Sequence, residues 1–146
     1  MRVVLDTNVI FEGLTKQAGA CGLIIEAWRA DIMTVCVSNA ISFEYEDVLS
    51  RKLSEKRWHE LRPILNGLLR RHVRFVDIYF SWRPTSPDPG DDHIIDCAAN
   101  ASAIIVTSNL KDFAQAKSKL GLKILTPNAL VSFLANPSFF DVARYN

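Results

Sequence analysis

The chain has 146 residues, of which 49% are hydrophobic and 23% charged, and its formal net charge is +1. This composition is typical of a globular protein and excludes collagen-like, coiled-coil and disordered chains. The length predicts one domain, which we expect at residues 1–135 with a tail at 136–146. No apolar run approaches the roughly 18 residues that a membrane span requires, and the start MRVVLDTN, with an aspartate at position 6, does not resemble a signal peptide. We therefore expect a cytoplasmic protein with no membrane-spanning segment.

The predicted elements alternate between strand and helix along the chain. Short apolar runs rich in β-branched residues predict strands at residues 2–6, 32–38, 103–107 and 122–126, with a weaker one at 73–78. Helical periodicity predicts helices at residues 22–30, 39–53, 55–72, 91–100, 110–120 and 127–134. Ser38 or Asn39 could cap the second helix, and Pro127 suits a first helical turn. This alternation predicts an α/β fold with a mostly parallel sheet.

Two segments fall outside this alternation. Residues 81–90 hold three of the six prolines and predict a loop that leads into an acidic cluster. The tail at 136–146 carries Phe139, Phe140 and Tyr145, which either pack back on the domain or bind another molecule.

The three cysteines argue against a disulfide framework. Cys21, Cys36 and Cys97 are odd in number, scattered along the chain, and include no CxxC pair. The histidines also lack the spacing of metal ligands, so a zinc site is not expected. We expect three buried thiols in a reducing compartment.

Acidic residues stand where a parallel sheet would present them to a ligand. Asp6 directly follows the apolar run VVL, and ligands bind outside the carboxyl ends of the strands in open parallel sheets. The alternative is that Asp6 caps a following helix. Glu44 falls on the flank of an apolar helical face that includes Ile41, Tyr45 and Leu49, where a half-buried acid would need a partner or a metal ion. The alternative is a solvated glutamate.

A dense acidic cluster precedes the helix predicted at 91–100. Asp88, Asp91, Asp92 and Asp96 lie within nine residues, and no Lys or Arg stands between positions 84 and 110. Like charges at this density repel one another unless a cation is present. Asp91 or Asp92 could instead cap the helix and interact favourably with its dipole.

A further acid, Asp112, follows the fourth apolar run in the sequence TSNLKDF. Asn109 and Asp112 also resemble a capping box. In an α/β sheet Asp6, Glu44, Asp92 and Asp112 can converge at one edge. Carboxylates without a histidine or cysteine ligand set indicate a site for Mg²⁺ or Mn²⁺, and such sites typically serve phosphoryl chemistry.

The basic residues are concentrated between positions 51 and 74. This segment holds eight of the 17 Lys and Arg residues and only two acids, Glu55 and Glu60, with Trp58 and His59 interleaved. A basic stripe beside an acidic metal pocket suits a polyanion whose backbone is bound while one phosphodiester is cut. The alternative is an ordinary solvated helix face.

The N-terminal motif VVLDTNVI resembles the opening signature of PIN domains, which are metal-dependent ribonucleases. Asp6 matches the first acid of the family, with Thr7 and Asn8 in the usual following positions. Glu44, in EYEDVL, resembles the second acid, and Asp92, in DPGDDHIIDCA, resembles the third.

The last motif, VTSNLKDF, completes the resemblance. Thr107 and Asp112 look like the strand-end threonine and the fourth acid of the family. The resemblance covers roughly residues 2–134 and is nearest to the subfamily of toxins from toxin–antitoxin systems. Two features depart from the pattern: Asn109 stands where many members have an aspartate, and Asp91 adjoins Asp92, so the third acid could be either.

The resemblance implies a three-layer α/β/α fold with a five-stranded parallel sheet in the order 3-2-1-4-5. The first and fourth strands would then be neighbours, which agrees with the placement of Asp6 and Asp112. It further implies homodimers and, for a toxin, an antitoxin partner.

The leading hypothesis is an endoribonuclease that depends on Mg²⁺ or Mn²⁺ and leaves a 5′-phosphate and a 3′-hydroxyl. The expected catalytic and metal-binding residues are Asp6, Glu44, Asp92 and Asp112. The residues expected to orient these ligands or water are Asn8, Asp91, Thr107 and Asn109. The residues expected to bind the RNA backbone are Arg51, Lys52, Lys56, Arg57, Arg70 and Arg71.

Two other hypotheses remain. The first is a PIN-like module that binds RNA or protein with little catalysis, although retention of all four acids speaks against it. The second is an α/β phosphohydrolase with an aspartate nucleophile. Such enzymes usually carry a second aspartate two residues later, where this chain has Asn8.

Overall fold

The computed structural model describes residues 1–81 and 90–136. The expectations for most of the proline-rich loop, including Asp88, and for the aromatic residues of the tail fall on residues 82–89 and 137–146, and lie outside the described residues.

The five predicted strands are present and form one parallel sheet in the order β3-β2-β1-β4-β5, as expected. The strands are β1 (Arg2–Leu5), β2 (Thr34–Val37), β3 (Val73–Phe75), β4 (Ile104–Val106) and β5 (Ile124–Leu125). Each is shorter than predicted, and at several carboxyl ends the reason is a polar residue that leaves the ladder. Ser38 and Thr126, for example, accept hydrogen bonds from the backbone N–H groups of Ile41 and Ala129 and so cap the next helix.

Six of the observed helices correspond to the predicted ones. They are α2 (Ala20–Arg29), α3 (Asn39–Lys52), α4 (Glu55–Arg71), α5 (Asp91–Ala101), α6 (Ala114–Leu120) and α7 (Pro127–Ala135). The predicted helix at 110–120 begins instead with a 3-10 turn, η1 (Leu110–Phe113).

Helix α1 (Thr7–Thr15) was not predicted. Its sequence has β-branched residues and Gly13, which have low helix propensity, but Val9, Ile10 and Leu14 are buried, so tertiary packing stabilises the helix. Gly13 allows close packing on α2, because a Cβ there would lie 2.6 Å from the Cys21 carbonyl oxygen.

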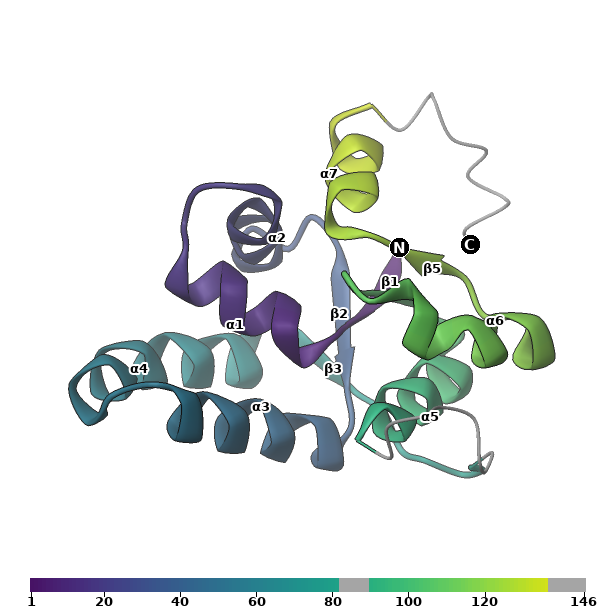
Figure 1. Ribbon diagram of the computed structural model, residues 1–146, viewed down its shortest axis with the longest axis horizontal. Helices are drawn as coiled ribbons and strands as arrows, with labels where there is room; N and C mark the ends of the chain where they lie inside the picture. The colour runs from purple at the N-terminus through teal and green to yellow at the C-terminus, as the bar shows by residue number, and fades with distance from the viewer. Residues whose placement is uncertain (82–89, 137–146) are drawn as a thin grey trace.

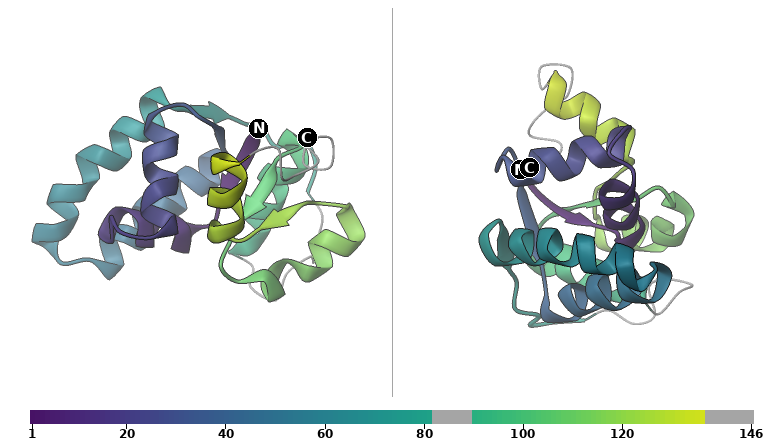
Figure 2. Two further views of the ribbon diagram at one scale, coloured as in Figure 1. Left: turned by 90° about the horizontal axis from the view of Figure 1, so that it is seen from above. Right: turned by 90° about the vertical axis from the view of Figure 1, so that its left-hand side faces the viewer.

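The helices cover both faces of the sheet. Helices α1 to α4 lie on one side of the strands and α5 and α6 on the other (Figure 1), and α7 packs against α2 and β5 (Figure 2). This is the expected three-layer α/β/α arrangement. The chain crosses from one face to the other between β3 and β4, so β1 and β4 are neighbours at the switch point of the strand order.

The core lies between the sheet and both helical layers. Trp28 is fully buried, and its indole Nε1 donates to the His72 carbonyl at 2.8 Å, which ties α2 to the end of α4. Cys21, Cys36 and Cys97 are buried free thiols, as expected. Burial is the main reason that the pKa of Cys97 is raised to about 12 and that of Cys21 to about 11.

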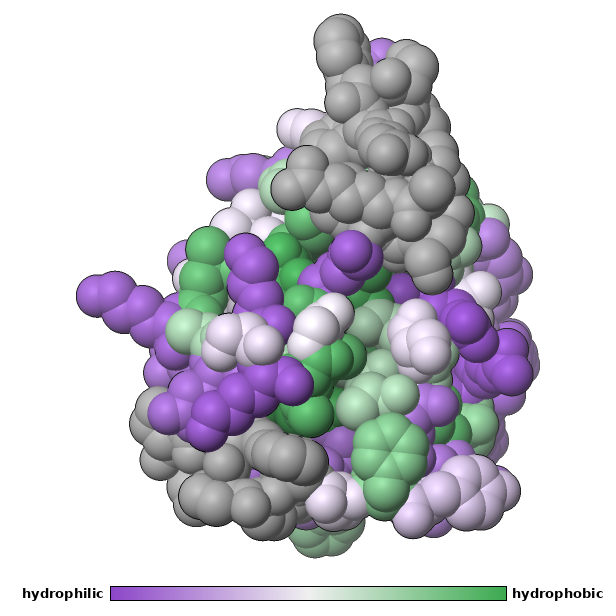
Figure 3. All heavy atoms as spheres, turned by 90° about the vertical axis from the view of Figure 1, so that its right-hand side faces the viewer, coloured by the Kyte–Doolittle hydropathy of each residue, from purple (hydrophilic) through white to green (hydrophobic). Residues whose placement is uncertain are grey.

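The face formed by α5, α6 and β5 is largely apolar in its middle (Figure 3). A hollow of about 320 Å³ there is lined by Phe80, Ile104, Leu120 and Leu122, among others. In the part of the chain that the structure covers, none of the helices combines the length and apolar character needed to cross a membrane.

Candidate active site

The centre of the site is a buried hydrogen bond between Asp6 and Thr107, which follow the adjacent strands β1 and β4. The Thr107 hydroxyl donates to Asp6 Oδ2 at 2.7 Å, and the Asp6 N–H donates to the Val106 carbonyl at 2.9 Å. The exposed fractions of Asp6 and Thr107 are 7% and 0%. Asp6 occupies the N-cap position of α1, but its carboxylate makes no capping hydrogen bond there. The side chain is therefore held at the sheet edge rather than used to cap α1.

The hydrogen bonding continues from Thr107 to a second acid. The Thr107 Oγ1 accepts from the Asn109 N–H at 3.0 Å, and the Asn109 Nδ2 donates to Asp112 Oδ2 at 2.6 Å. The side chain of Asn109 makes no capping bond to η1, so the capping-box interpretation is wrong. Asp6, Thr107, Asn109 and Asp112 instead form one continuous chain. An aspartate at position 109 could not donate to Asp112, so the departure from the family pattern has a structural role here.

Glu44 lies on α3 at the same edge of the sheet, and the contacts of its neighbour Tyr45 indicate this position. Tyr45 is fully buried, and its hydroxyl donates to the Leu5 carbonyl, one residue before Asp6. Burial raises the pKa of Tyr45 well above its usual value, and the negative charges of Cys97, Asp6 and Glu44 raise it further. Both acids therefore lie near this hydroxyl. Glu44 is half-buried, on the flank of a buried face, as the helical periodicity predicted.

The acids of α5 also lie at the carboxyl edge of the sheet, because α5 runs from that edge back to the start of β4. Asp92 and Asp96 are each only 5% exposed, and Asp91 is half-buried. Gly90 occupies the N-cap position, so the expectation that Asp91 or Asp92 caps this helix is wrong. Both lie in the first turn, where the helix dipole favours negative charge. Helix α5 packs against β1, β2 and β4, which brings its first turn toward Asp6.

The basic residues do not form one stripe along the acids. Arg51, Lys52, Lys56 and Arg57 surround the turn between α3 and α4, which lies away from the strands (Figure 1). The end of α4 carries two further arginines, Arg70 and Arg71, just before β3 and hence at the amino edge of the sheet.

Several of these cations are also paired. Arg51 lies 3.0 Å from an Asp47 oxygen and Arg57 lies 3.1 Å from a Glu60 oxygen. Lys52 Nζ lies 5.2 Å from the centre of the Phe11 ring. Surface pairs of this kind are weak, so the cations could still exchange them for phosphate contacts.

The ligand chemistry of the edge suits a hard divalent cation. Its acids and hydroxyl offer oxygen atoms, and buried carboxylates are stabilised by positive charge. Among residues 1–81 and 90–136, no three Asp, Glu, His or Cys side chains lie close enough together to hold a metal ion. Mg²⁺ is usually bound by only one or two carboxylates, with water and substrate phosphate completing its coordination, so the residues present fit such an ion.

Asn8, which the sequence analysis expected to orient ligands or water, is exposed near the start of α1 at this edge. The sequence analysis used Tyr45 only as a core residue and missed the hydrogen bond by which its hydroxyl supports β1. The signal was present, because a tyrosine on a fully buried helical face needs a hydrogen-bond partner.

The comparisons with known proteins agree with this arrangement. Residues 2–111 match the family model of the PIN domain. VapBC2 from Rickettsia felis, bound to promoter DNA, is similar in structure with a TM-score of 0.62, 19% identity, and coverage of 86% of this chain and 98% of that chain. DNA-bound VapBC from Salmonella typhimurium gives a TM-score of 0.62, 16% identity, and coverage of 87% and 98%.

The PIN domain endonuclease Utp24 gives a TM-score of 0.52, 18% identity, and coverage of 86% of this chain and 84% of that chain. No curated protein has a significantly similar sequence. At these identities the solved structures support the fold alone. The family model matches well over half of the 146 residues, and the chain therefore belongs to the PIN-domain family.

Proposed function

We propose that this protein is a metal-dependent endoribonuclease and the toxin of a toxin–antitoxin pair. The observation that carries the proposal is the hydrogen-bonded chain from Asp6 through Thr107 and Asn109 to Asp112, with Glu44 near the same strand end. Membership of the PIN-domain family supports it, as does the similarity to VapBC structures and to an endonuclease.

The four acids of the site are the proposed metal ligands. Asp6, Glu44, Asp92 and Asp112 would hold Mg²⁺ or Mn²⁺, one or two of them by direct contact and the others through water. The ion would supply the positive charge that activates water and stabilises the leaving oxygen. The Thr107 hydroxyl fixes the orientation of the Asp6 carboxylate.

Three further residues complete the proposed site. Asn109 fixes the Asp112 carboxylate through its amide. Asn8 and Asp91 stand at the rim and would orient water. The expected products carry a 5′-phosphate and a 3′-hydroxyl.

The RNA backbone would be bound by cations at some distance from the cut. Lys52, Lys56 and their neighbours Arg51 and Arg57 are exposed around the α3–α4 turn and form the larger basic group. The arginines that end α4 lie at the opposite edge of the sheet and would contact only RNA that passes around β3. We therefore expect neutralisation near the α3–α4 turn to weaken binding more.

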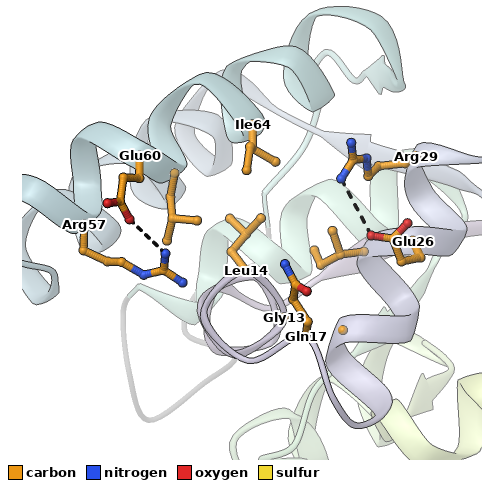
Figure 4. Close-up of a pocket in the computed structure, with 11 residues that line it drawn as sticks. Gly13, Leu14, Gln17, Glu26, Arg29, Arg57, Glu60 and Ile64 are labelled. Carbon is orange, nitrogen blue, oxygen red and sulfur yellow. Dashed lines mark hydrogen bonds and ion pairs between the residues drawn. The ribbon is translucent and has the colours of Figure 1, made fainter.

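A groove between α1, α2 and α4 suits the proposed antitoxin. It has a volume of about 370 Å³, and its lining includes Leu14 and Ile64. Figure 4 shows the Glu26–Arg29 and Arg57–Glu60 ion pairs on opposite sides of it, with the apolar residues between. An apolar floor between charged rims suits an amphipathic segment of a partner protein. Capture of a partner that Ile64→Glu abolishes, and Ile32→Glu does not, would support this assignment.

A homodimer is part of the same proposal, and the apolar face over β5 offers a surface for it. Light scattering of the purified protein measures the mass directly. A concentration-independent monomer would refute this part of the proposal.

The decisive experiment is cleavage of a labelled single-stranded RNA panel by the purified protein in Mg²⁺, in Mn²⁺ and in EDTA. Asp6→Asn is the matched variant, because it keeps the size of the side chain and removes the charge. We expect metal-dependent cleavage that Asp6→Asn abolishes. Binding without cleavage in either metal would favour the alternative of a PIN-like binding module, and cleavage that survives EDTA and Asp6→Asn would refute the site.

A further inference from the structure

A second groove lies beside the acids at the carboxyl edge of the sheet. It has a volume of about 360 Å³ and lies between the start of α3, the segment after β3, and α5. Its lining includes Asn39, Ala40, Ile78, His93 and Asp96. The last two of these belong to the first turns of α5, next to the proposed metal ligand of that helix. The groove therefore lies beside the proposed active site.

The side-chain amide of Asn100 holds the segment that forms one wall of this groove. Asn100 Oδ1 accepts from the Tyr79 N–H at 3.0 Å, and Asn100 Nδ2 donates to the carbonyls of Phe80 at 2.9 Å and Asp96 at 2.8 Å. These bonds fix the backbone of the segment on α5. Side chains on it are therefore presented in a defined orientation before any ligand arrives.

The side chain of Tyr79 has no role in the core. It is 85% exposed, the highest value among the large hydrophobic side chains that the structure describes as exposed. Its neighbours Ile78 and Phe80 are 38% and 56% exposed. Exposed aromatic groups on a fixed backbone are typical of binding surfaces. Ile78 and Ser81 line the groove on either side of Tyr79 in the sequence, so the backbone of Tyr79 passes along it.

The chemistry of the groove favours a nucleobase over a phosphate. Asp77 and Asp96 repel anions, but carboxylates accept hydrogen bonds from the amino groups of bases. Ala40 and Ile78 provide apolar walls for a flat ring, and His93 provides a further polar contact. An exposed tyrosine ring offers a surface on which the next unpaired base can stack.

We propose that this groove and Tyr79 bind two consecutive unpaired bases of the RNA strand beside the phosphodiester that is cut. The groove receives one base and the tyrosine ring stacks on the next. This inference rests on the proposed ribonuclease function, because it takes the strand in the active site as its ligand.

The test measures binding of fluorescent single-stranded RNA octamers by anisotropy in EDTA, where no metal-dependent cleavage occurs. We expect Tyr79→Ala to weaken binding about 10-fold, or about 1.4 kcal/mol, and Tyr79→Trp to restore it. Ala40→Phe, which fills the groove, should weaken binding similarly. The matched controls are Ile32→Ala and Ala30→Phe, because both residues are exposed before β2, at the opposite edge of the sheet.

Octamers with single abasic positions identify the contact as one with a base. At least one abasic position should weaken binding of the octamer by the wild type. The Tyr79→Ala variant should bind that abasic octamer about as well as it binds the intact one. Binding by Tyr79→Ala within about twofold of the wild type, or equal losses on single-stranded and duplex RNA, would refute the proposal. Cleavage is measured separately in Mn²⁺, so a wild type that shows the base effect without cleavage would refute the nuclease function and leave the base site supported.

Discussion

Replacement of Thr107 by valine tests the central contact of the site. Valine has nearly the shape of threonine, so Thr107→Val removes the hydroxyl without opening a cavity. Two hydrogen bonds are lost, one to the Asp6 carboxylate at 2.7 Å and one from the Asn109 N–H at 3.0 Å. Because Thr107 is fully buried, water cannot take the place of the hydroxyl without rearrangement.

The magnitude follows from these two bonds. A hydrogen bond to a charged group contributes about 1.5–3 kcal/mol and a neutral one about 0.5–1.5 kcal/mol, so we expect Thr107→Val to lower the free energy of unfolding by about 2–4 kcal/mol. The control is Thr107→Ser, which keeps the hydroxyl and removes one methyl group, at a cost of about 1 kcal/mol. The valine variant should therefore be the less stable of the two, although its side chain is more apolar.

Urea unfolding followed by circular dichroism measures both variants. A loss of 2–4 kcal/mol would lower the midpoint by about 1–2 M at the slopes usual for small domains. If Thr107→Val is as stable as the wild type, or more stable than Thr107→Ser, the hydroxyl does not support Asp6 and the reasoning about the site is wrong.

Three further outcomes are expected. Tyr45→Phe removes the hydrogen bond to the Leu5 carbonyl, so it should lower the affinity for Mn²⁺, measured by electron paramagnetic resonance, while the circular dichroism spectrum stays unchanged. Asn109→Asp replaces an amide donor with a second carboxylate beside Asp112. It should therefore destabilise the metal-free protein and strengthen Mn²⁺ binding. A melting temperature of this variant that Mn²⁺ does not change would contradict this. The pKa of Cys97 is raised to about 12, so the folded state keeps the thiol proton after the unfolded state has lost it near pH 9. The free energy of unfolding should therefore fall between about pH 9 and 12. Urea unfolding at each pH should show a less steep fall for Cys97→Ala.

The strands could be predicted because each is a short apolar run, a pattern that is typical of a buried strand. Their order could not, and it came from the family resemblance. The contact between Asp6 and Thr107 joins residues 101 positions apart, and no local pattern encodes it. Helix α1 was not predicted for a related reason. Its stability comes from packing on α2 and not from the helix propensity of its own residues.

The basic segment shows how a linear pattern can mislead. Between positions 51 and 74 the charge is concentrated, and one would expect a single stripe. The chain instead turns between α3 and α4, and α4 carries the later arginines to the amino edge of the sheet. Residues close in sequence thus lie at two ends of a 17-residue helix, about 25 Å apart at 1.5 Å per residue.

The site places buried negative charge at the carboxyl edge of the sheet. Asp6 and Asp92 are nearly inaccessible to water, and a buried carboxylate is costly unless hydrogen bonds or a cation compensate. Thr107 compensates Asp6 in part, and the first turn of α5 does so for Asp92 through its dipole. A divalent cation would compensate both more fully, so metal binding should also stabilise the folded state.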